Sequence, residues 1–461
     1  MKTFSFRGLL QRDGWIENPV VTVDANGIIA EISSNASINA DIRIDGFALP
    51  GFQNAHSHAF QYGMAGLAEV HTAGRTSDDF WSWREAMYSL ALSVDPDQME
   101  AIATMVYSEM VRQGYTNVAE FHYVHHDKDG KRYSNLAEMG SRLIAAAAKA
   151  KINITLIPIF YQKGGFGKEP TDRQRRFISP DIDAYLQLFE ASEKACRDYS
   201  GANLGVGVHS LRGVEPSDVI ELAKSGPQDV PFHIHISEQL QEVEDAVAYL
   251  KMRPVEWLLE NVELNDRFHL VHATHLTESE RRGLATSNAH VVLCPSTEGN
   301  LGDGIFPLRS YQSEGGKWSI GTDSHVGLNP LEELRILDYG QRLTTHKRNT
   351  FTSETEGDSG MYAITMATLS GRKSVNNTQE EFFAPGEPFN AAIIEATSPL
   401  LATSSPTYRT STILYSSDAT GQWGTVVNGD IIVERGRHHA GEEIVEEFAK
   451  VMRALGSRTS S

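Results

Sequence analysis

The sequence predicts an α/β fold, a (β/α)8 barrel joined to a small β domain that is built from both ends of the chain. Two observations predict it. Eight short apolar segments alternate with helix-like stretches through the middle of the chain, which is typical of parallel βαβ units. A pair of strand-like segments around an Asn-Gly turn occurs near each end, and neither pair alone could bury a sheet face.

The two ends of the chain carry the predicted β domain. Val20–Val23 and Ile28–Ile32 flank Asn26-Gly27, a dipeptide that favours a tight hairpin turn. Near the other end, Thr425–Val427 and Ile431–Glu434 flank Asn428-Gly429, and Ala391–Glu395 is a third short apolar segment. We therefore expect residues 1–47 and 380–461 to form the small domain and its tail, and residues 48–379 to form the barrel.

The barrel is predicted from the alternation of its segments. The strand-like segments are Phe47–Phe52, Thr116–Val124, Ile152–Phe160, Leu204–Arg212, Pro231–Glu238, Phe268–His275, His290–Thr297 and Trp318–His325. The helix-like stretches include Asp97–Gln113, Ser134–Ala150, Asp181–Tyr199, Glu215–Lys224, Glu238–Lys251 and Thr277–Ala285. Eight strands of this kind favour a closed barrel, in which the chemistry gathers at the carboxyl ends of the strands. Asp78–Leu92 interrupts the pattern after the first strand, as a lid segment would.

Composition narrows the class of protein. The 461 residues carry a formal net charge of −19, and a surface that acidic repels nucleic acid. No apolar segment approaches the ~18 residues that a membrane span needs. Two cysteines are too few for a disulfide framework, so we expect a cytoplasmic protein. An anionic ligand would need a local cationic pocket in such a chain.

Histidines and acids follow the predicted strands in a pattern that indicates a metal site. His56 and His58 stand two residues apart on an extended segment, so both imidazoles can reach one ion. His235, near the end of the fifth strand, is our preferred third ligand, whereas His233 is expected to be a packed interior residue. Asp323, at the end of the eighth strand, would complete the set and leave one position open for water.

Two further strand ends carry candidate catalytic groups. Glu238 lies just past the fifth strand, where it can exchange protons with a molecule bound at the metal. On the sixth strand we favour His272 as a group that polarises the substrate, with His269 and His275 as weaker candidates. On the fourth strand, Arg212 follows His209 by three residues and suits a bidentate carboxylate clamp.

These segments resemble the amidohydrolase superfamily and, within it, the formimidoylglutamate deiminases. The resemblance covers nearly the whole chain and lies in PGFQNAHSHAFQ, WSWRE, EFHYVHHD, VHSLRG, HIHISEQ, LVHATHL, CPSTEGNLGDGIFP and GTDSHVGLNP. It implies a distorted (β/α)8 TIM barrel with a small β-sandwich domain from both termini, and a homodimer. Asn390, where the superfamily often has aspartate, is a departure that lies away from the chemistry.

The resemblance also implies roles for individual residues. His56, His58, His235 and Asp323 would hold a single divalent metal, Zn2+ or alternatively Fe2+, since the fourth strand has no bridging lysine for a second ion. Glu238, His272 and Asp323 would be catalytic. The implied reaction is the hydrolysis of N-formimino-L-glutamate to N-formyl-L-glutamate and ammonia in histidine degradation, with attack by a metal-bound hydroxide on the formimino carbon.

The implied substrate carries two carboxylates, and the resemblance assigns its pocket to both cationic and neutral groups. These residues are Gln61, Arg84, Tyr123, His209 and Arg212. Two alternatives remain open at this point. One is a deaminase of a purine, pyrimidine or triazine ring on the same scaffold, which would need stacking aromatics rather than two arginines. The other is an inert barrel that serves only as a scaffold, for which an acid beside an open metal position has no use.

Overall fold

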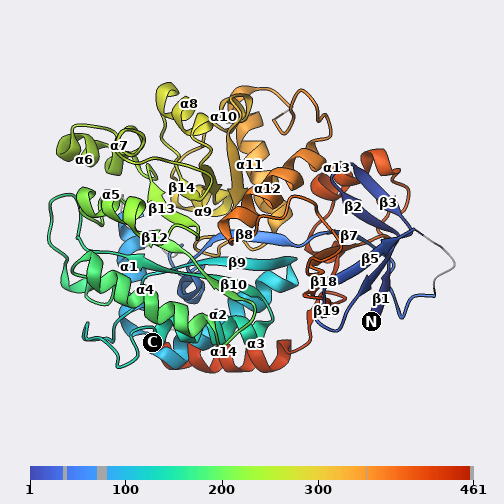
Figure 1. The fold of residues 1–461 in the computed structure, drawn as a ribbon, viewed down its shortest axis with the longest axis horizontal. Coiled ribbons are helices and arrows are strands. Elements are labelled where there is room, and N and C mark those ends of the chain that lie inside the picture. Colours follow the sequence, from blue (N-terminus) through green and yellow to red (C-terminus); the bar gives the residue numbers. More distant parts are fainter. Residues whose placement is uncertain (35–38, 70–79, 349, 457–461) are drawn as a thin grey trace.

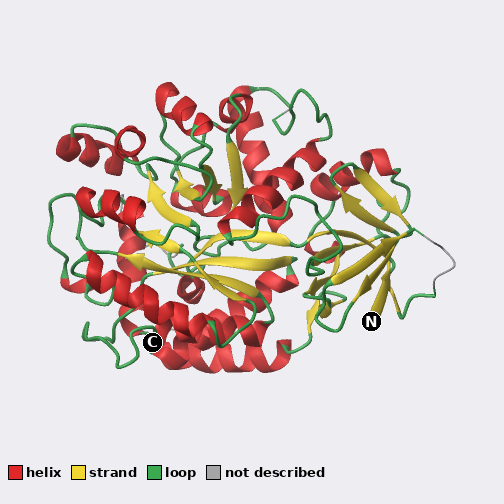
Figure 2. Cartoon of the chain, viewed as in Figure 1, coloured by secondary structure: helices red, strands yellow, loops and turns green. Residues whose placement is uncertain are grey.

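The chain folds into a barrel enclosed by helices, with a smaller β-rich body at one end (Figures 1 and 2). The computed structural model describes residues 1–34, 39–69, 80–348 and 350–456. One continuous apolar core extends from the β-rich body into the layer between the barrel strands and their helices. No helix in the described ranges is long and apolar enough to cross a membrane.

Eight parallel strands form the barrel, which confirms the predicted fold class. Their order around the barrel is β8 (Phe52–Ser57), β9 (Tyr115–His122), β10 (Asn153–Phe160), β12 (Val206–Val208), β13 (Phe232–Ile236), β14 (Phe268–His272), β15 (His290–Leu293) and β16 (Lys317–Ile320). The short strand β11 (Ala202–Leu204) pairs with the first half of β10. A parallel bridge between Ser57 and Asp323 joins the first strand to the segment after the last one.

The limits of the predicted barrel strands differ from those in the structure, and two of these differences have a clear local cause. The segment predicted as the first barrel strand, Phe47–Phe52, is instead mostly β7 (Gly46–Pro50), which pairs with β17 (Ala391–Glu395) of the small domain. The barrel strand β8 follows after Gly51, and because residues 46–57 are all buried, hydrophobicity alone does not mark the transition. The predicted strand His290–Thr297 stops at Leu293, because Pro295 begins the helix α9 (Pro295–Leu301).

Helices cover the outside of the barrel where the sequence predicts them. These are α2 (Pro96–Arg112), α3 (Glu138–Ala150), α4 (Ile182–Cys196), α5 (Pro216–Ser225), α6 (Leu240–Leu250) and α8 (Glu278–Thr286). Local signals explain the starts of two of them, since Asp95 with Gln98 and Thr277 with Glu280 form capping boxes. Further helices are α7 (Pro254–Asn261), α10 (Leu308–Ser313), α11 (Pro330–Thr345) and α12 (Ser359–Ser374), with short 3-10 turns η1 (Ala59–Met64), η2 (Asp172–Gln174) and η3 (Ala419–Gly421).

The predicted lid segment is a helix in its described part. It is α1 (Phe80–Ser93), which contacts η1 and η2, whereas Asp78 lies outside the described residues.

Strands from both ends of the chain meet in the small domain, as predicted. One sheet has the order β5 (Ile29–Ser33), β4 (Val20–Val23), β1 (Lys2–Ser5) and β6 (Ile42–Arg43). The other has the order β20 (Arg437–His438), β19 (Asp430–Glu434), β18 (Gln422–Val427), β17, β7, β2 (Gly8–Gln11) and β3 (Gly14–Glu17), with α13 (Pro406–Ser416) beside it. The last helix, α14 (Gly441–Leu455), packs against α2 of the barrel (Figure 1). The division into residues 1–47, 48–379 and 380–461 stays a prediction.

Three histidines form a stack inside the barrel, at the end opposite the site described below. The rings of His233 and His269 lie 4.8 Å apart and those of His269 and His290 lie 5.1 Å apart, both nearly parallel. Helix α12 closes this end: His233 Nε2 donates to the carbonyl of Ser374, and His290 Nδ1 lies 2.6 Å from Ser370 Oγ. His233 is therefore a packed interior residue, as predicted.

Candidate active site

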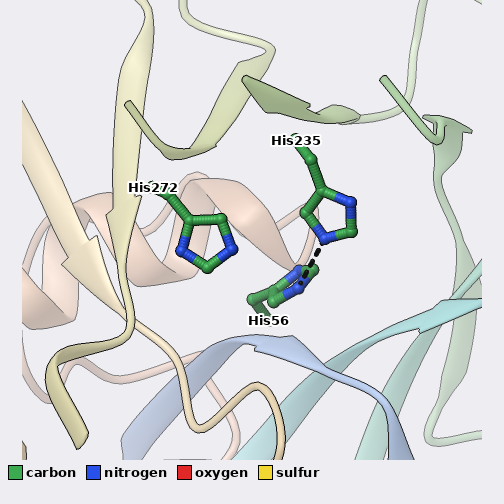
Figure 3. Close-up of side chains that lie close together, drawn as sticks. All are labelled: His56, His235 and His272. Atoms are coloured by element: carbon green, nitrogen blue, oxygen red, sulfur yellow. Dashed lines mark hydrogen bonds between the residues drawn. The ribbon is translucent and has the colours of Figure 1, made fainter. Parts of the chain in front are cut away.

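Three imidazoles and a carboxylate from three strand ends converge at the carboxyl end of the barrel. The Nε2 atom of His56 lies 3.2 Å from that of His58 and 3.0 Å from that of His235. Asp323 Oδ1 lies 3.6 Å from His56 Nε2 and 3.3 Å from His58 Nε2. Figure 3 shows His56 and His235 facing each other with His272 beside them. The structure thus brings together the four residues predicted as metal ligands.

The backbone near Asp323 places these side chains. His58 N–H donates to the Asp323 carbonyl and Asp323 N–H donates to the His56 carbonyl, at 3.2 and 3.0 Å. Gly321 lies so close to His56 that an added Cβ would stand 2.8–2.9 Å from His56 atoms. Asp323, three residues past β16, and His272, the last residue of β14, both have positive φ angles, of 47° and 70°, so neither side chain follows the alternation of an extended strand. Glycine and two strained residues therefore set the geometry of the cluster.

The donor atoms of this cluster fit a divalent cation. His58 Nδ1 donates to the Phe121 carbonyl at 2.8 Å, which leaves a lone pair on its Nε2. Burial, with the neighbouring His56, lowers the pKa of His58 to about 3, so the ring is neutral as a metal ligand must be. Ring nitrogens of neutral imidazoles this close together can direct their lone pairs at one cation. Ligand atoms around a tetrahedral Zn2+ stand about 3.3 Å apart, close to the separations observed here.

Glu238, His272 and Arg212 lie beside the cluster. His272 Nε2 is 3.8 Å from Glu238 Oε1 and 3.7 Å from Asp323 Oδ2, and Arg212 Nη2 is 3.6 Å from Glu238 Oε2. Burial alone would lower the pKa of His272, but Glu238 and Glu298 raise it to about 10. Burial raises the pKa of Glu238. These groups form a buried network that can hold and move protons next to the donor cluster.

The predicted pocket residues form a continuous wall with an aromatic residue that the sequence analysis did not single out. Gln61 Nε2 donates to the Tyr123 hydroxyl at 3.0 Å. The ring of His209 stacks on Tyr161 with centroids 4.1 Å apart, and Arg84 Nη2 donates to the Tyr161 hydroxyl at 3.3 Å. Burial, with Arg212 and Arg84, lowers the pKa of His209 well below its ordinary value. Tyr161 directly follows the strand β10, so its position at a strand end was a usable signal.

A second residue missed by the sequence analysis is Glu298, which is 5% exposed. Its Oε1 accepts from the backbone N–H of Cys294 at 2.9 Å and lies 3.2 Å from His272 Nδ1. The signal was its place in the CPSTEGN segment after the seventh strand.

The wall opens into a cavity of about 360 Å³ at the barrel mouth. Arg84, Arg212 and Lys168 line it from different elements, together with the acids Glu242 and Asp245. The two acids and Tyr249, whose ring contacts Phe166, belong to α6. A chain with a net charge of −19 therefore gathers three cations where a small molecule would enter.

Comparison with known proteins shows the family to which the chain belongs. A model of the amidohydrolase family matches residues 47–432. Formimidoylglutamate deiminase from Pseudomonas aeruginosa is 41% identical over 455 residues, which cover 98% of this chain and 99% of that protein. A crystal structure of an amidohydrolase from Brucella melitensis superposes with a TM-score of 0.92 at 38% identity, covering 99% of this chain and 100% of that one.

More distant proteins match the chain in sequence or in fold. A 5-methylthioadenosine/S-adenosylhomocysteine deaminase from Pyrococcus furiosus is 27% identical over 93% of this chain and 94% of that protein. A zinc-bound adenosine deaminase from Xanthomonas campestris superposes with a TM-score of 0.80 at 18% identity, covering 99% of this chain and 98% of that one. At that identity, the likeness establishes the fold alone.

Proposed function

The chain belongs to the amidohydrolase family, and we propose that it hydrolyses N-formimino-L-glutamate to N-formyl-L-glutamate and ammonia. The observation that carries the proposal is the pairing of the donor cluster with a cationic mouth. The full-length similarity to a formimidoylglutamate deiminase supports the same substrate. A diacid fits a mouth that carries Arg84 and Arg212, whereas a heteroaromatic amine would not need them.

We further propose that His56, His58, His235 and Asp323 hold one Zn2+. The neutral imidazoles, the carboxylate and their separations support this assignment. Zinc in such a site acts as a Lewis acid and lowers the pKa of water to roughly 7.

Asp323, Glu238 and His272 hold or transfer the protons of the reaction. Hydrolysis adds the oxygen of water to the formimino carbon and moves two protons to the departing nitrogen. Asp323 directs Oδ1 toward His56 and His58 but Oδ2 toward His272, so the second oxygen is available to accept a proton. Glu238 can deliver a proton to the imino nitrogen, because burial raises its pKa. Each transfer of this kind contributes ~10²–10⁴ in rate.

The two carboxylates of the substrate are assigned to the arginines. Arg212 lies beside Glu238 and therefore near the reacting group, which suits the carboxylate closest to the formimino nitrogen. Arg84 reaches the mouth from α1 and suits the distal carboxylate. Gln61, Tyr123 and His209 supply uncharged hydrogen bonds, since burial keeps Tyr123 protonated and His209 neutral.

The proposal is tested by measuring ammonia release from N-formimino-L-glutamate with zinc-loaded protein and identifying the second product. We expect formylglutamate and a clear preference over purine, pyrimidine and triazine amines. Equal or faster turnover of a ring amine would favour a ring deaminase, and no turnover of any substrate by metal-replete protein would favour an inert scaffold. Assembly as a homodimer and a cytoplasmic location stay predictions.

A further inference from the structure

Glu298 occupies an unusual position between a helix start and the proton-handling residues. It lies in the first turn of α9, which begins directly after the strand β15, and its side chain is buried. One oxygen, Oε1, receives both the Cys294 backbone N–H and His272 Nδ1. The carboxylate therefore ties the end of one strand to the side chain at the end of its neighbour.

The contact with Glu298 fixes which ring nitrogen of His272 points toward Glu238 and Asp323. A carboxylate accepts hydrogen bonds, so Nδ1 of His272 carries the proton that points to Glu298. The opposite nitrogen, Nε2, then points toward Glu238 Oε1 and Asp323 Oδ2, at 3.8 and 3.7 Å. His272 has a φ angle of 70°, so its ring does not follow the regular strand alternation, and the hydrogen bond to Glu298 holds the ring in this position.

We propose that Glu298 is a positioning residue that holds the ring orientation of His272, with Nδ1 facing Glu298, during the deimination. This inference rests on the proposed function, because its kinetic test measures the release of ammonia. Glu298 acts through His272 and does not touch the reacting atoms. Residues that orient a catalytic or metal-bound imidazole in this way contribute about 10–100-fold to activity.

A second buried glutamate that contacts the start of α9 provides a matched control. Glu333 is also buried, and it accepts from the Ser296 backbone N–H at 2.9 Å and from Ser296 Oγ at 2.5 Å. Replacing Glu333 by alanine removes a buried acceptor from the start of α9, as Glu298→Ala does, but leaves the Glu298–His272 contact in place. The pair therefore separates an effect on His272 from an effect on the helix.

The experiment measures kcat, KM and bound zinc for the holoenzyme and for Glu298→Ala, Glu298→Gln and Glu333→Ala. Glu298→Ala should lower kcat about 10–100-fold with KM changed less than about threefold and full zinc content. Glu298→Gln should restore most of kcat, because both donors reach one oxygen that the amide retains. Glu333→Ala should keep kcat near that of the wild type.

A spectroscopic readout makes the test independent of turnover. In 15N-histidine-labelled holoenzyme, the His272 Nδ1–H signal should be present and shifted downfield in the wild type and in Glu298→Gln. Wild-type kcat in Glu298→Ala, equal impairment of Glu298→Gln and Glu298→Ala, or absence of the signal would overturn the inference. If Glu298→Ala does not fold, the signal in Glu298→Gln decides. Failure of the wild type to release ammonia would instead refute the proposed function.

Discussion

Replacing His290 by glutamine should make the protein less sensitive to acid. His290 ends the imidazole stack inside the barrel, and burial lowers its pKa from 6.5 to about 3. The folded protein therefore keeps this ring neutral, while the unfolded chain takes up a proton once the pH falls below 6.5. The stability that it contributes is present above pH 6.5 and is lost progressively as the pH falls toward 3.

The size of the effect follows from the two pKa values. At pH 5, about 30 times more unfolded chains carry a proton on this ring than lack one, whereas the folded ring stays neutral, so unfolding is favoured by about 2 kcal/mol. His233 has the same lowered pKa of about 3, and burial lowers the pKa of His269 well below its ordinary value. His233 and His290 together therefore destabilise the fold by about 4 kcal/mol at pH 5, a large part of a typical total, and His269 acts in the same direction.

The assay is urea unfolding of the wild type and His290→Gln at pH 7 and at pH 5. Glutamine keeps a polar partner for Ser370 Oγ but does not titrate. Between pH 7 and pH 5 the wild type should lose about 2 kcal/mol more stability than the variant. Contributions from other histidines cancel in this comparison. Equal losses in the two proteins would show that His290 is protonated in the fold and would refute the reasoning.

Three further predictions concern the site. Arg212→Ala should reduce kcat/KM for the diacid by about 10²-fold or more, through lost charged hydrogen bonds, while zinc content stays unchanged; near-normal kcat/KM would remove Arg212 from the pocket. Gly321→Ala should destabilise the protein by about 1–3 kcal/mol and lower its zinc content, because the new Cβ would collide with His56. An unchanged Tm and a full zinc content would contradict this prediction. His56→Ala should lose zinc, whereas Glu238→Gln should keep zinc and lose ammonia release, and the reverse pattern would refute both assignments.

Much of the architecture follows from local pattern. The period of the apolar segments and the turn dipeptides, such as Asn428-Gly429, predict the barrel and the two-ended β domain. The boundary at Gly51 cannot be predicted from local pattern, because the strands on either side of it are equally buried and belong to different sheets. Helix α14 was missed although its sequence is amphipathic, and its packing on α2 depends on a contact between residues more than 300 positions apart.

Some contacts of the candidate site can be predicted from the sequence, and others cannot. Residues two apart on one strand, such as His56 and His58, share a face, so sequence alone predicts that they lie together. Convergence of Asp323 and His235 needs the closed barrel and was inferred from strand ends and from a family resemblance. Glu298 reaches His272 only because Pro295 starts a helix that turns the chain back over the strand end. The sequence carries no periodic signal for such a contact.

The most direct test of the account is a crystal structure of zinc-loaded protein with anomalous diffraction data collected at the zinc edge. We predict a single strong peak within about 2.0–2.2 Å of nitrogen atoms of His56, His58 and His235 and an oxygen of Asp323. A fully occupied peak elsewhere in the chain, or no peak among these four side chains in protein that retains its zinc, would contradict it.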